Sequence, residues 1–141
     1  MNKQNQRLDT NRKTAVIYAR ASIQGCEKCT GERTQGALKK QQEQCEDYTK
    51  TILGAEVKAS FTDANDGSKS MTGRPGFQNL LSYLFDDQHA DYLVVADHDR
   101  LTRNYAEYIL LMLAMDSLGT ELVVVNASEL DHSIVSHRLR R

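Results

Sequence analysis

An arginine and a serine stand two positions apart at the end of the first apolar segment, AVIYARAS. Side chains two apart on an extended backbone point to the same side, so we expect Arg20 and Ser22 to present a cation and a hydroxyl together. A second pair, Arg100 and Arg103, is three apart and shares one side of a helix if a helix has begun there. With Arg74, four arginines are available to surround one hydroxyl. This combination predicts a phosphate site that contains a nucleophile.

A serine that attacks a phosphodiester needs its proton removed, the developing charge on the non-bridging oxygens held, and the leaving oxygen protonated. The planar guanidinium group of arginine binds phosphate oxygens through paired hydrogen bonds. A carboxylate such as Asp99 can orient an arginine or transfer a proton. Arginines that hold the charge make a metal ion unnecessary, so we expect no metal and no cofactor.

Each of these charges has an ordinary explanation when taken singly. The segment DHDRLTRN is also typical of a solvated helix start with Asp99 near the N-cap. Their joint position favours a site, because ligands of open α/β sheets bind beyond the carboxyl ends of the strands. The candidates at these ends are Tyr18, Arg20 and Ser22 after the first strand, Asp63 and Arg74 in the loop after the second, and Asp97, Asp99, Arg100 and Arg103 after the third.

Short apolar runs alternate along the chain with segments of helical periodicity. This alternation predicts right-handed crossovers and an α/β fold of three layers, with a mostly parallel sheet of four or five strands and helices on both faces. The glycine-rich, polar stretches IQGCEKCTGERTQG and TDANDGSKSMTGRPG predict loops. We expect strands at 15–17, 55–61, 92–96 and 122–125, and helices at about 34–52, 77–87 and 104–118.

The helical periodicity also predicts which residues share a face. Gly54 and Gly119 are placed to end the first and third helices. The predicted inward residues are Leu38, Gln41, Cys45, Tyr48 and Ile52 in the first helix and Phe77, Leu80, Leu81, Leu84 and Phe85 in the second, while Ile109, Leu110 and Leu113 share one side of the third.

Five motifs, in this order, resemble the serine recombinase family of resolvases, invertases and integrases. They are Y-A-R-A-S at 18–22, a helix containing Gln41, Asp63 ahead of a loop, G-R-P-G-F at 73–77 and D-R-L-T-R-N at 99–104. The resemblance spans about Thr14 to Ala127, and the combination is far more specific than any single motif. The polar lead-in, the C-E-D-Y segment and G-R-P-G-F are closer to the large serine recombinases than to the small resolvases.

The resemblance implies a catalytic domain in which Ser22 attacks the DNA backbone, forming a 5′-phosphoserine link and releasing a 3′-hydroxyl. It implies that enzymes of this kind act on double-stranded recombination sites as dimers that synapse into tetramers. By the same resemblance Arg20, Arg74, Arg100 and Arg103 hold the scissile phosphate, Asp99 orders them or protonates the leaving oxygen, Gln41 and Asp63 support the site, and Tyr18 serves packing.

The chain has 141 residues and a formal net charge of -1, so bulk charge neither favours nor excludes a nucleic-acid partner. No apolar run approaches the roughly 20 residues that span a bilayer and no secretion signal begins the chain, so we expect no membrane partner and a cytoplasmic location. Residues 1–13 are expected to be a disordered lead-in and 14–127 the catalytic domain. The basic end at 128–141 is expected to be the start of a truncated linker or helix, and we expect the isolated domain to be inactive alone.

Two other readings stay open at this point. One is a catalytically inert relative that joins recombinase dimers or synapses. The other is a small phosphatase, which ranks last because this sequence has neither a C-x5-R loop nor an aspartate-rich metal motif. Cys26 and Cys29 form a C-x-x-C pair without a partner motif, so an ordinary loop is favoured over a zinc site. His98 is the one histidine beside the candidate site, and we expect it to be structural.

Overall fold

The core of the protein is a parallel β-sheet. The computed structural model describes residues 12–21, 27–64, 73–86, 89–102 and 104–126, with the backbone alone for 27–32. Within these residues the sheet has four strands in the order β2-β1-β3-β4, and every pairing is parallel. The strands are β1 (Thr14–Ala21), β2 (Glu56–Ala64), β3 (Tyr92–Val95) and β4 (Glu121–Val124).

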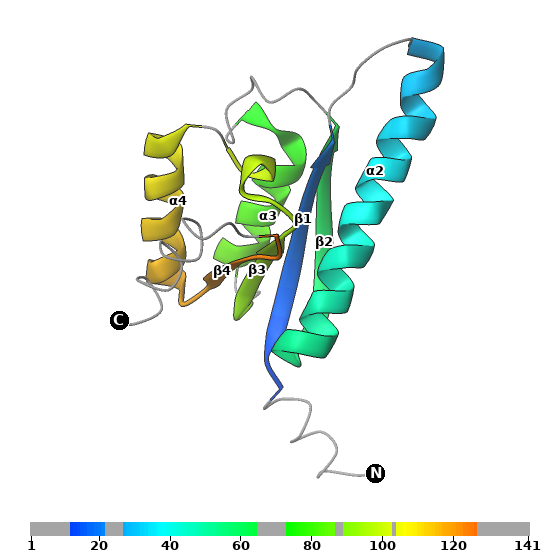
Figure 1. Cartoon of the computed structure of the whole chain (residues 1–141). Coiled ribbons are helices and arrows are strands. Elements are labelled where there is room, and N and C mark those ends of the chain that lie inside the picture. Colours follow the sequence, from blue (N-terminus) through cyan, green and yellow to red (C-terminus); the bar gives the residue numbers. More distant parts are fainter. Residues whose placement is uncertain (1–11, 22–26, 65–72, 87–88, 103, 127–141) are drawn as a thin grey trace.

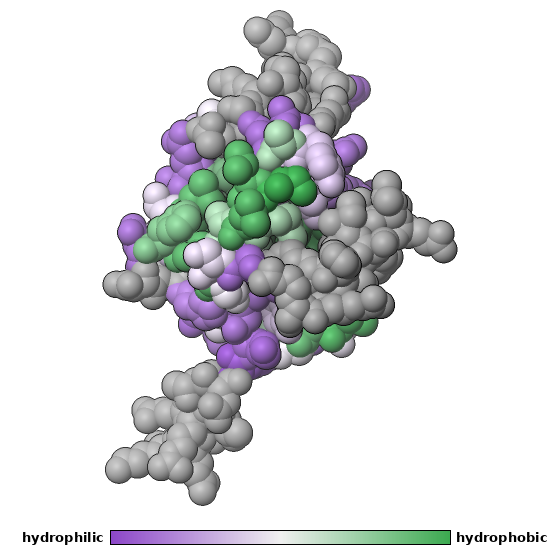
Figure 2. Space-filling view, turned by 90° about the vertical axis from the view of Figure 1, so that its left-hand side faces the viewer, coloured by the Kyte–Doolittle hydropathy of each residue, from purple (hydrophilic) through white to green (hydrophobic). Residues whose placement is uncertain are grey.

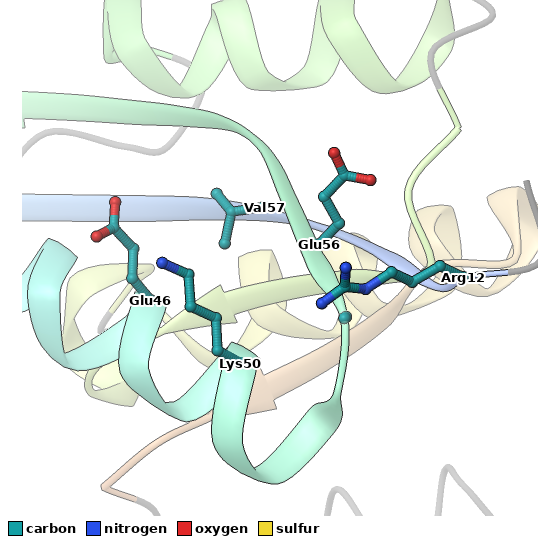
Figure 3. A pocket seen from close by; sticks show the side chains of 6 residues that line it. Arg12, Glu46, Lys50, Glu56 and Val57 are labelled. Carbon is teal, nitrogen blue, oxygen red and sulfur yellow. The ribbon is translucent and has the colours of Figure 1, made fainter. Parts of the chain in front are cut away.

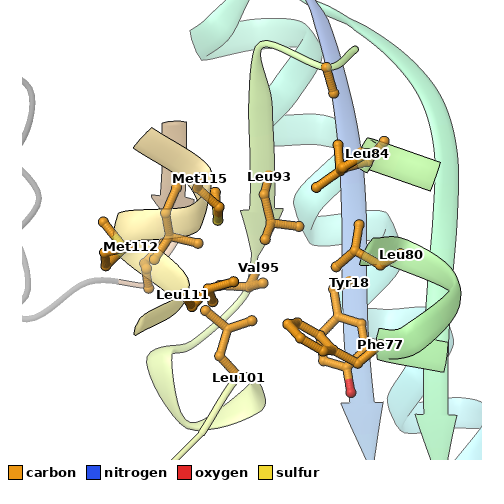
Figure 4. Close-up of a cluster of buried hydrophobic side chains, with 14 of the residues drawn as sticks. Tyr18, Phe77, Leu80, Leu84, Leu93, Val95, Leu101, Leu111, Met112 and Met115 are labelled. Atoms are coloured by element: carbon orange, nitrogen blue, oxygen red, sulfur yellow. The ribbon is translucent and has the colours of Figure 1, made fainter. Parts of the chain in front are cut away.

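Helices cover both faces of this sheet (Figure 1). Helix α2 (Glu27–Tyr48) lies along one face, whereas α3 (Pro75–Phe85) and α4 (Tyr105–Leu118) lie on the other. The larger apolar core fills the space between the sheet and α3 and α4 (Figure 4). A smaller core, which includes Cys45 and Ile17, lies under α2. The predicted three-layer α/β fold is therefore confirmed.

Strand β1 is buried along almost its whole length, which explains its continuous apolar run. It pairs with β2 from Thr14 to Ala21, but with β3 only from Ala15 to Tyr18. The carboxyl end of β1 therefore extends past its β3 neighbour. At this end, other groups must satisfy the main chain on the β3 side.

The predicted loop at 23–36 is wrong from Glu27 onward, because α2 already begins there. Glycines and polar residues in this stretch favour a loop, but they do not prevent a helix here. A glycine inside a helix costs only about 1 kcal/mol relative to alanine, and neighbouring residues with good helix propensity outweigh that. Gly36 is exposed within α2, and a Cβ placed there would meet nothing within 4 Å. Gly54 does end this segment, in the left-handed conformation with φ 63°.

Strand β2 is longer than predicted, and its extension moves one candidate residue. It runs to Ala64, so Asp63 lies on the strand and not in the following loop, and it pairs in register with Arg20. Pairing with the long β1 accounts for the extension, since main-chain hydrogen bonding along β1 continues wherever a partner is available. The fourteen-residue α4 ends at Gly119, as predicted.

Several apolar side chains predicted to share inward or common faces are exposed. Ile52 is 65% exposed because it lies in a π-helical turn, Thr49–Leu53, where the spacing of α2 is not continued. Phe85 is 57% exposed at the last residue of α3. Apolar residues surround the whole of α4, so periodicity alone does not select its buried side. Its buried residues are Tyr108, Leu111, Met112 and Met115, and Ile109, Leu110 and Leu113 lie on the exposed side.

The exposed side of α4 forms an apolar surface patch (Figure 2). Its members are Ile109, Leu110 and Leu113, with Tyr105 at the start of the helix. A search for helices long and apolar enough to cross a bilayer finds none in the described part of the chain.

Candidate active site

Two arginines are buried at the carboxyl end of the sheet, each with only 1% of its surface exposed. Arg20 comes from β1, and Arg74 is the N-cap residue of α3, held in an extended conformation ahead of Pro75. A proline fixes its own φ and favours an extended residue before it, so R-P sets both the start of the helix and the position of the arginine. The two guanidinium groups thus come from different layers of the fold.

The 98–101 turn, which consists of the 3-10 helix His98–Arg100 and Leu101, holds both guanidinium groups. Nη2 of Arg20 donates to the main-chain oxygen of Asp99 at 3.2 Å. Nη1 of Arg74 donates to the main-chain oxygens of Arg100, at 3.1 Å, and of Leu101. Carbonyl acceptors fix the plane of each guanidinium group in advance, so binding a phosphate there costs less ordering of these side chains.

The two side chains in the middle of this turn, Asp99 and Arg100, are more exposed than its main chain. Asp99 is exposed, and its carbonyl oxygen, not its carboxylate, makes the contact with Arg20. Arg100 is half-buried, with Nε 3.7 Å from a carboxylate oxygen of Asp97. The turn therefore offers one cation and one carboxylate toward solvent while its main chain faces the two buried arginines.

Asp63 accepts three hydrogen bonds, two of which anchor the start of α3. Its carboxylate accepts from the main-chain N–H groups of Gly76, at 2.7 Å, and Phe77, at 2.9 Å. It also accepts from the hydroxyl of Tyr18 at 2.8 Å. A carboxylate is favoured at a helix N-terminus because free N–H groups and the helix dipole both attract negative charge. Since Arg74 directly precedes this helix, Asp63 positions Arg74.

Tyr18 is a packing residue whose hydroxyl also contacts the side chains of Asp63 and Arg74. Its ring meets that of Phe77 edge-on, with centroids 5.4 Å apart (Figure 4). Burial raises the pKa of the Tyr18 phenol well above its usual value, and the hydrogen bond to Asp63 acts in the same direction. The hydroxyl is therefore a hydrogen-bond donor at neutral pH and not a base.

Gln41 of α2 satisfies the main chain of Arg20 where β3 has ended. Its Nε2 donates to the carbonyl oxygen of Arg20 at 2.8 Å, and its Oε1 accepts from the N–H of Arg20 at 3.1 Å. The side-chain amide thus takes the place of a neighbouring strand.

The structure brings together most of the residues that the sequence singled out. The turn at 98–101 accepts hydrogen bonds from both Arg20 and Arg74. The surrounding contacts come from Gln41, which binds the main chain of Arg20, and from Asp63, which binds the hydroxyl of Tyr18 and the start of α3. Ser22, Arg103, the Cys26 and Cys29 segment, residues 1–11 and 128–141 lie outside the described residues, except for the backbone of Cys29 within α2.

Two features of the site were missed by the sequence reading. The carbonyl acceptors of residues 99–101 have no side-chain signal. The requirement for glycine at position 76 has a sequence signal, because Gly76 follows a proline at a helix start. A Cβ at this position would lie 2.1 Å from the main-chain oxygen of Thr62. Only glycine lets α3 approach β2 closely enough for Asp63 to reach the helix N-terminus. Among the described residues, no group of three His, Cys, Asp or Glu is arranged to hold a metal ion.

A hollow lies at the amino end of the strands, opposite the buried arginines (Figure 3). Arg12, Lys50, Glu46 and Glu56 line it together with Ala55 and Val57. Two cations and two carboxylates give it no net charge of one sign, so nothing in its lining favours a phosphate. The buried arginines at the carboxyl end remain the stronger candidate site.

A parallel α/β sheet with two buried, pre-oriented arginines at its carboxyl edge is typical of α/β domains that bind phosphate groups. A sequence model of the family described as "Resolvase, N terminal domain" matches residues 15–139. The chain belongs to this family, and it is a catalytic domain of the serine site-specific recombinases. Domains of this family act on DNA and self-associate.

Solved structures with the same fold belong to the same class. The N-terminal catalytic domain of TP901-1 integrase has a TM-score of 0.64 at 19% identity, over 91% of this chain and 92% of that one. The C-terminal catalytic domain of ISC1926 TnpA, an IS607-like serine recombinase, has a TM-score of 0.64 at 25% identity, over 90% and 76%. A resolvase family site-specific recombinase from Streptococcus pneumoniae has a TM-score of 0.63 at 17% identity, over 92% and 87%. No protein among those with curated functions matches the chain in sequence.

Proposed function

We propose that this domain cleaves and rejoins DNA through a covalent link between Ser22 and a 5′-phosphate. The hydroxyl oxygen of Ser22 bonds to phosphorus, and its proton passes to a base. The bond between phosphorus and the 3′-oxygen breaks, and that oxygen takes up a proton and leaves as a 3′-hydroxyl. Reversal of the same steps rejoins the strand, because the phosphoserine bond retains the energy of the phosphodiester.

The observation that supports this proposal is a pair of buried, pre-oriented arginines. Arg20 lies two residues before Ser22, and Arg74 lies at the start of α3. We assign Arg20 and Arg74 to the non-bridging oxygens of the scissile phosphate, with Arg100 and Arg103 completing the charge around it. Preorganised cations stabilise developing charge without the cost of reorganisation. Asp99, whose side chain is exposed beside Arg100, orders the arginines or protonates the leaving oxygen.

We propose further that the domain works on double-stranded sites as a dimer, that two dimers form a synaptic tetramer, and that it acts in the cytoplasm. The apolar patch on α4 supports self-association: a helix that is apolar on every side is usually buried on every side. Covering Ile109, Leu110 and Leu113 removes this surface from water.

A covalent-capture assay tests the proposal. Because we expect the isolated domain to be inactive alone, the chain is fused after Arg141 to a sequence-specific DNA-binding domain and incubated with duplexes in which the site of that domain flanks randomised DNA. The mixture is denatured in detergent and probed for DNA that remains attached to protein. We expect attachment at Ser22, mapped by mass spectrometry, and none from Ser22→Ala. Ser82→Ala is the matched control, since Ser82 is an exposed serine of α3, and it should form the adduct normally. Attachment that persists in Ser22→Ala refutes the assignment, and its absence from the unmodified chain favours the inert relative.

A further inference from the structure

The 98–101 turn carries the carbonyl acceptors of both buried arginines, so the position of this turn decides where the guanidinium groups lie. Its internal hydrogen bonds, from Arg100 N to Asp97 O and from Leu101 N to His98 O, are both 3.0 Å long. They fix the shape of the turn but not its place on the sheet. Something else must hold it there.

Two side chains attach the turn to the protein interior, one at each end. Leu101, at the carboxyl end, is fully buried and belongs to the core between the sheet and α4 (Figure 4). His98, at the amino end, places its ring 4.3 Å from that of Tyr108, centroid to centroid, with the planes inclined at 53°. Tyr108 is a buried residue of α4. Between these ends, Asp99 is exposed and Arg100 only half-buried.

The ring contact, and not a hydrogen bond, accounts for the attachment of His98. Its Nε2 is buried and has no hydrogen-bond partner within the described part of the chain. Aromatic rings at this separation attract one another beyond the effect of the buried area. His98 is thus the link between α4 and the amino end of the turn.

We infer that His98 is a positioning residue for the arginine pair, and above all for Arg20. This inference rests on the proposed function only for its consequence in catalysis. Without the ring contact the turn pivots about Leu101, and the carbonyl of Asp99 moves further than that of Leu101. Of the hydrogen bonds that the two arginines donate to this turn, that of Arg20 goes to Asp99, whereas those of Arg74 go to Arg100 and Leu101. Loss of His98 therefore loosens Arg20 more than Arg74.

Exchange of guanidinium protons with water, followed by nuclear magnetic resonance on the 141-residue chain, tests this inference. In His98→Ala we expect the protons of Arg20 to exchange about two- to tenfold faster, as loss of one aromatic contact predicts, with a smaller change at Arg74. His98→Phe keeps a ring and should restore slow exchange. His98→Leu is a second ring-free variant in case the alanine variant does not fold. His89→Ala is the matched control, because His89 is an exposed histidine just before β3.

The covalent-capture assay supplies the second readout, with the duplex pool that the unmodified chain captures. We expect the rate of adduct formation to fall in the ring-free variants by the factor seen for Arg20 exchange, and to recover in His98→Phe. Unchanged Arg20 exchange in the ring-free variants, or equal acceleration at both arginines, overturns the inference. If Arg20 exchanges faster in the ring-free variants but the unmodified chain forms no adduct, the positioning role of His98 is supported and only the proposed function is contradicted.

Discussion

The side-chain amide of Gln41 brackets the main chain of Arg20, donating to its carbonyl at 2.8 Å and accepting from its N–H at 3.1 Å. The two residues lie 21 positions apart and on different layers. Strand β3 stops pairing at Tyr18, so β1 has an open edge at the point where Arg20 enters the candidate site. Gln41 closes that edge with the hydrogen-bonding pattern of a peptide group.

Replacing Gln41 should therefore destabilise the carboxyl end of β1. In Gln41→Ala two buried main-chain groups lose their partner, and we expect the free energy of unfolding in urea to fall by about 1–3 kcal/mol. Gln42→Ala is the matched control, since the amide of Gln42 bonds to the hydroxyl of exposed Ser60. Equal losses in the two variants would contradict the role assigned to Gln41.

Two glycines in helices should respond in opposite directions to alanine. In Gly76→Ala the new Cβ would lie 2.1 Å from the main-chain oxygen of Thr62, so α3 must move away from β2. We expect thermal unfolding to show a loss of about 1–3 kcal/mol, as for other overpacked sites. Gly36→Ala meets nothing within 4 Å and should stabilise the chain by up to about 1 kcal/mol. A neutral Gly76→Ala would show that the close approach is not required.

The hydrogen bonds that Asp63 accepts should contribute unequally to stability. Asp63→Ala leaves the N–H groups of Gly76 and Phe77 and the hydroxyl of Tyr18 without their acceptor. We expect a loss of about 3 kcal/mol, whereas Tyr18→Phe removes only one of the three donors to Asp63 and should cost about 1 kcal/mol. Urea titrations of both variants measure the difference. If Tyr18→Phe costs as much as Asp63→Ala, the helix N-terminus is not what Asp63 chiefly stabilises.

Stability should depend on pH through Asp91. Burial acts to raise its pKa, but hydrogen bonds from the Thr14 main chain and from His89 outweigh that, and the pKa is lowered. A carboxyl group with a lowered folded-state pKa stabilises the fold above its unfolded-state value, about 3.9, and this contribution is lost as the pH falls through the folded-state value. Asp91→Asn should lower stability at neutral pH and flatten the acid limb of unfolding. An unchanged acid limb would assign that dependence to other carboxyl groups.

Cys45 should be unreactive in the folded protein. It is fully buried under α2, and burial raises the pKa of its thiol to about 12. The thiolate is the reactive form, so alkylation at pH 8 should spare Cys45 until the chain unfolds. Mass spectrometry of peptides after iodoacetamide treatment, with and without urea, checks this. Rapid labelling without urea would mean that α2 opens readily from the sheet.

The sequence alone was sufficient for the α/β class, because continuous apolar runs and helical spacing report which residues an element buries. It placed Arg20, Arg74 and Asp99 at one edge of the sheet, since parallel strands bring their carboxyl ends together. It predicted α4 and its end but did not select the buried side of this helix, because apolar residues on every side leave periodicity uninformative. It was wrong about the loop that includes Gly36, where helix propensity overrode a local breaker.

Only the tertiary structure decided what holds the site together. Arg20 donates to a main-chain oxygen 79 positions away, and Arg74 to two that lie 26 and 27 positions away. Every residue presents the same main-chain carbonyl group whatever its side chain, so no pattern of residue types marks these acceptors. The ring contact between His98 and Tyr108 depends in the same way on how the turn and α4 meet. Residue types determined which chemistry is available, and packing between distant segments determined its geometry.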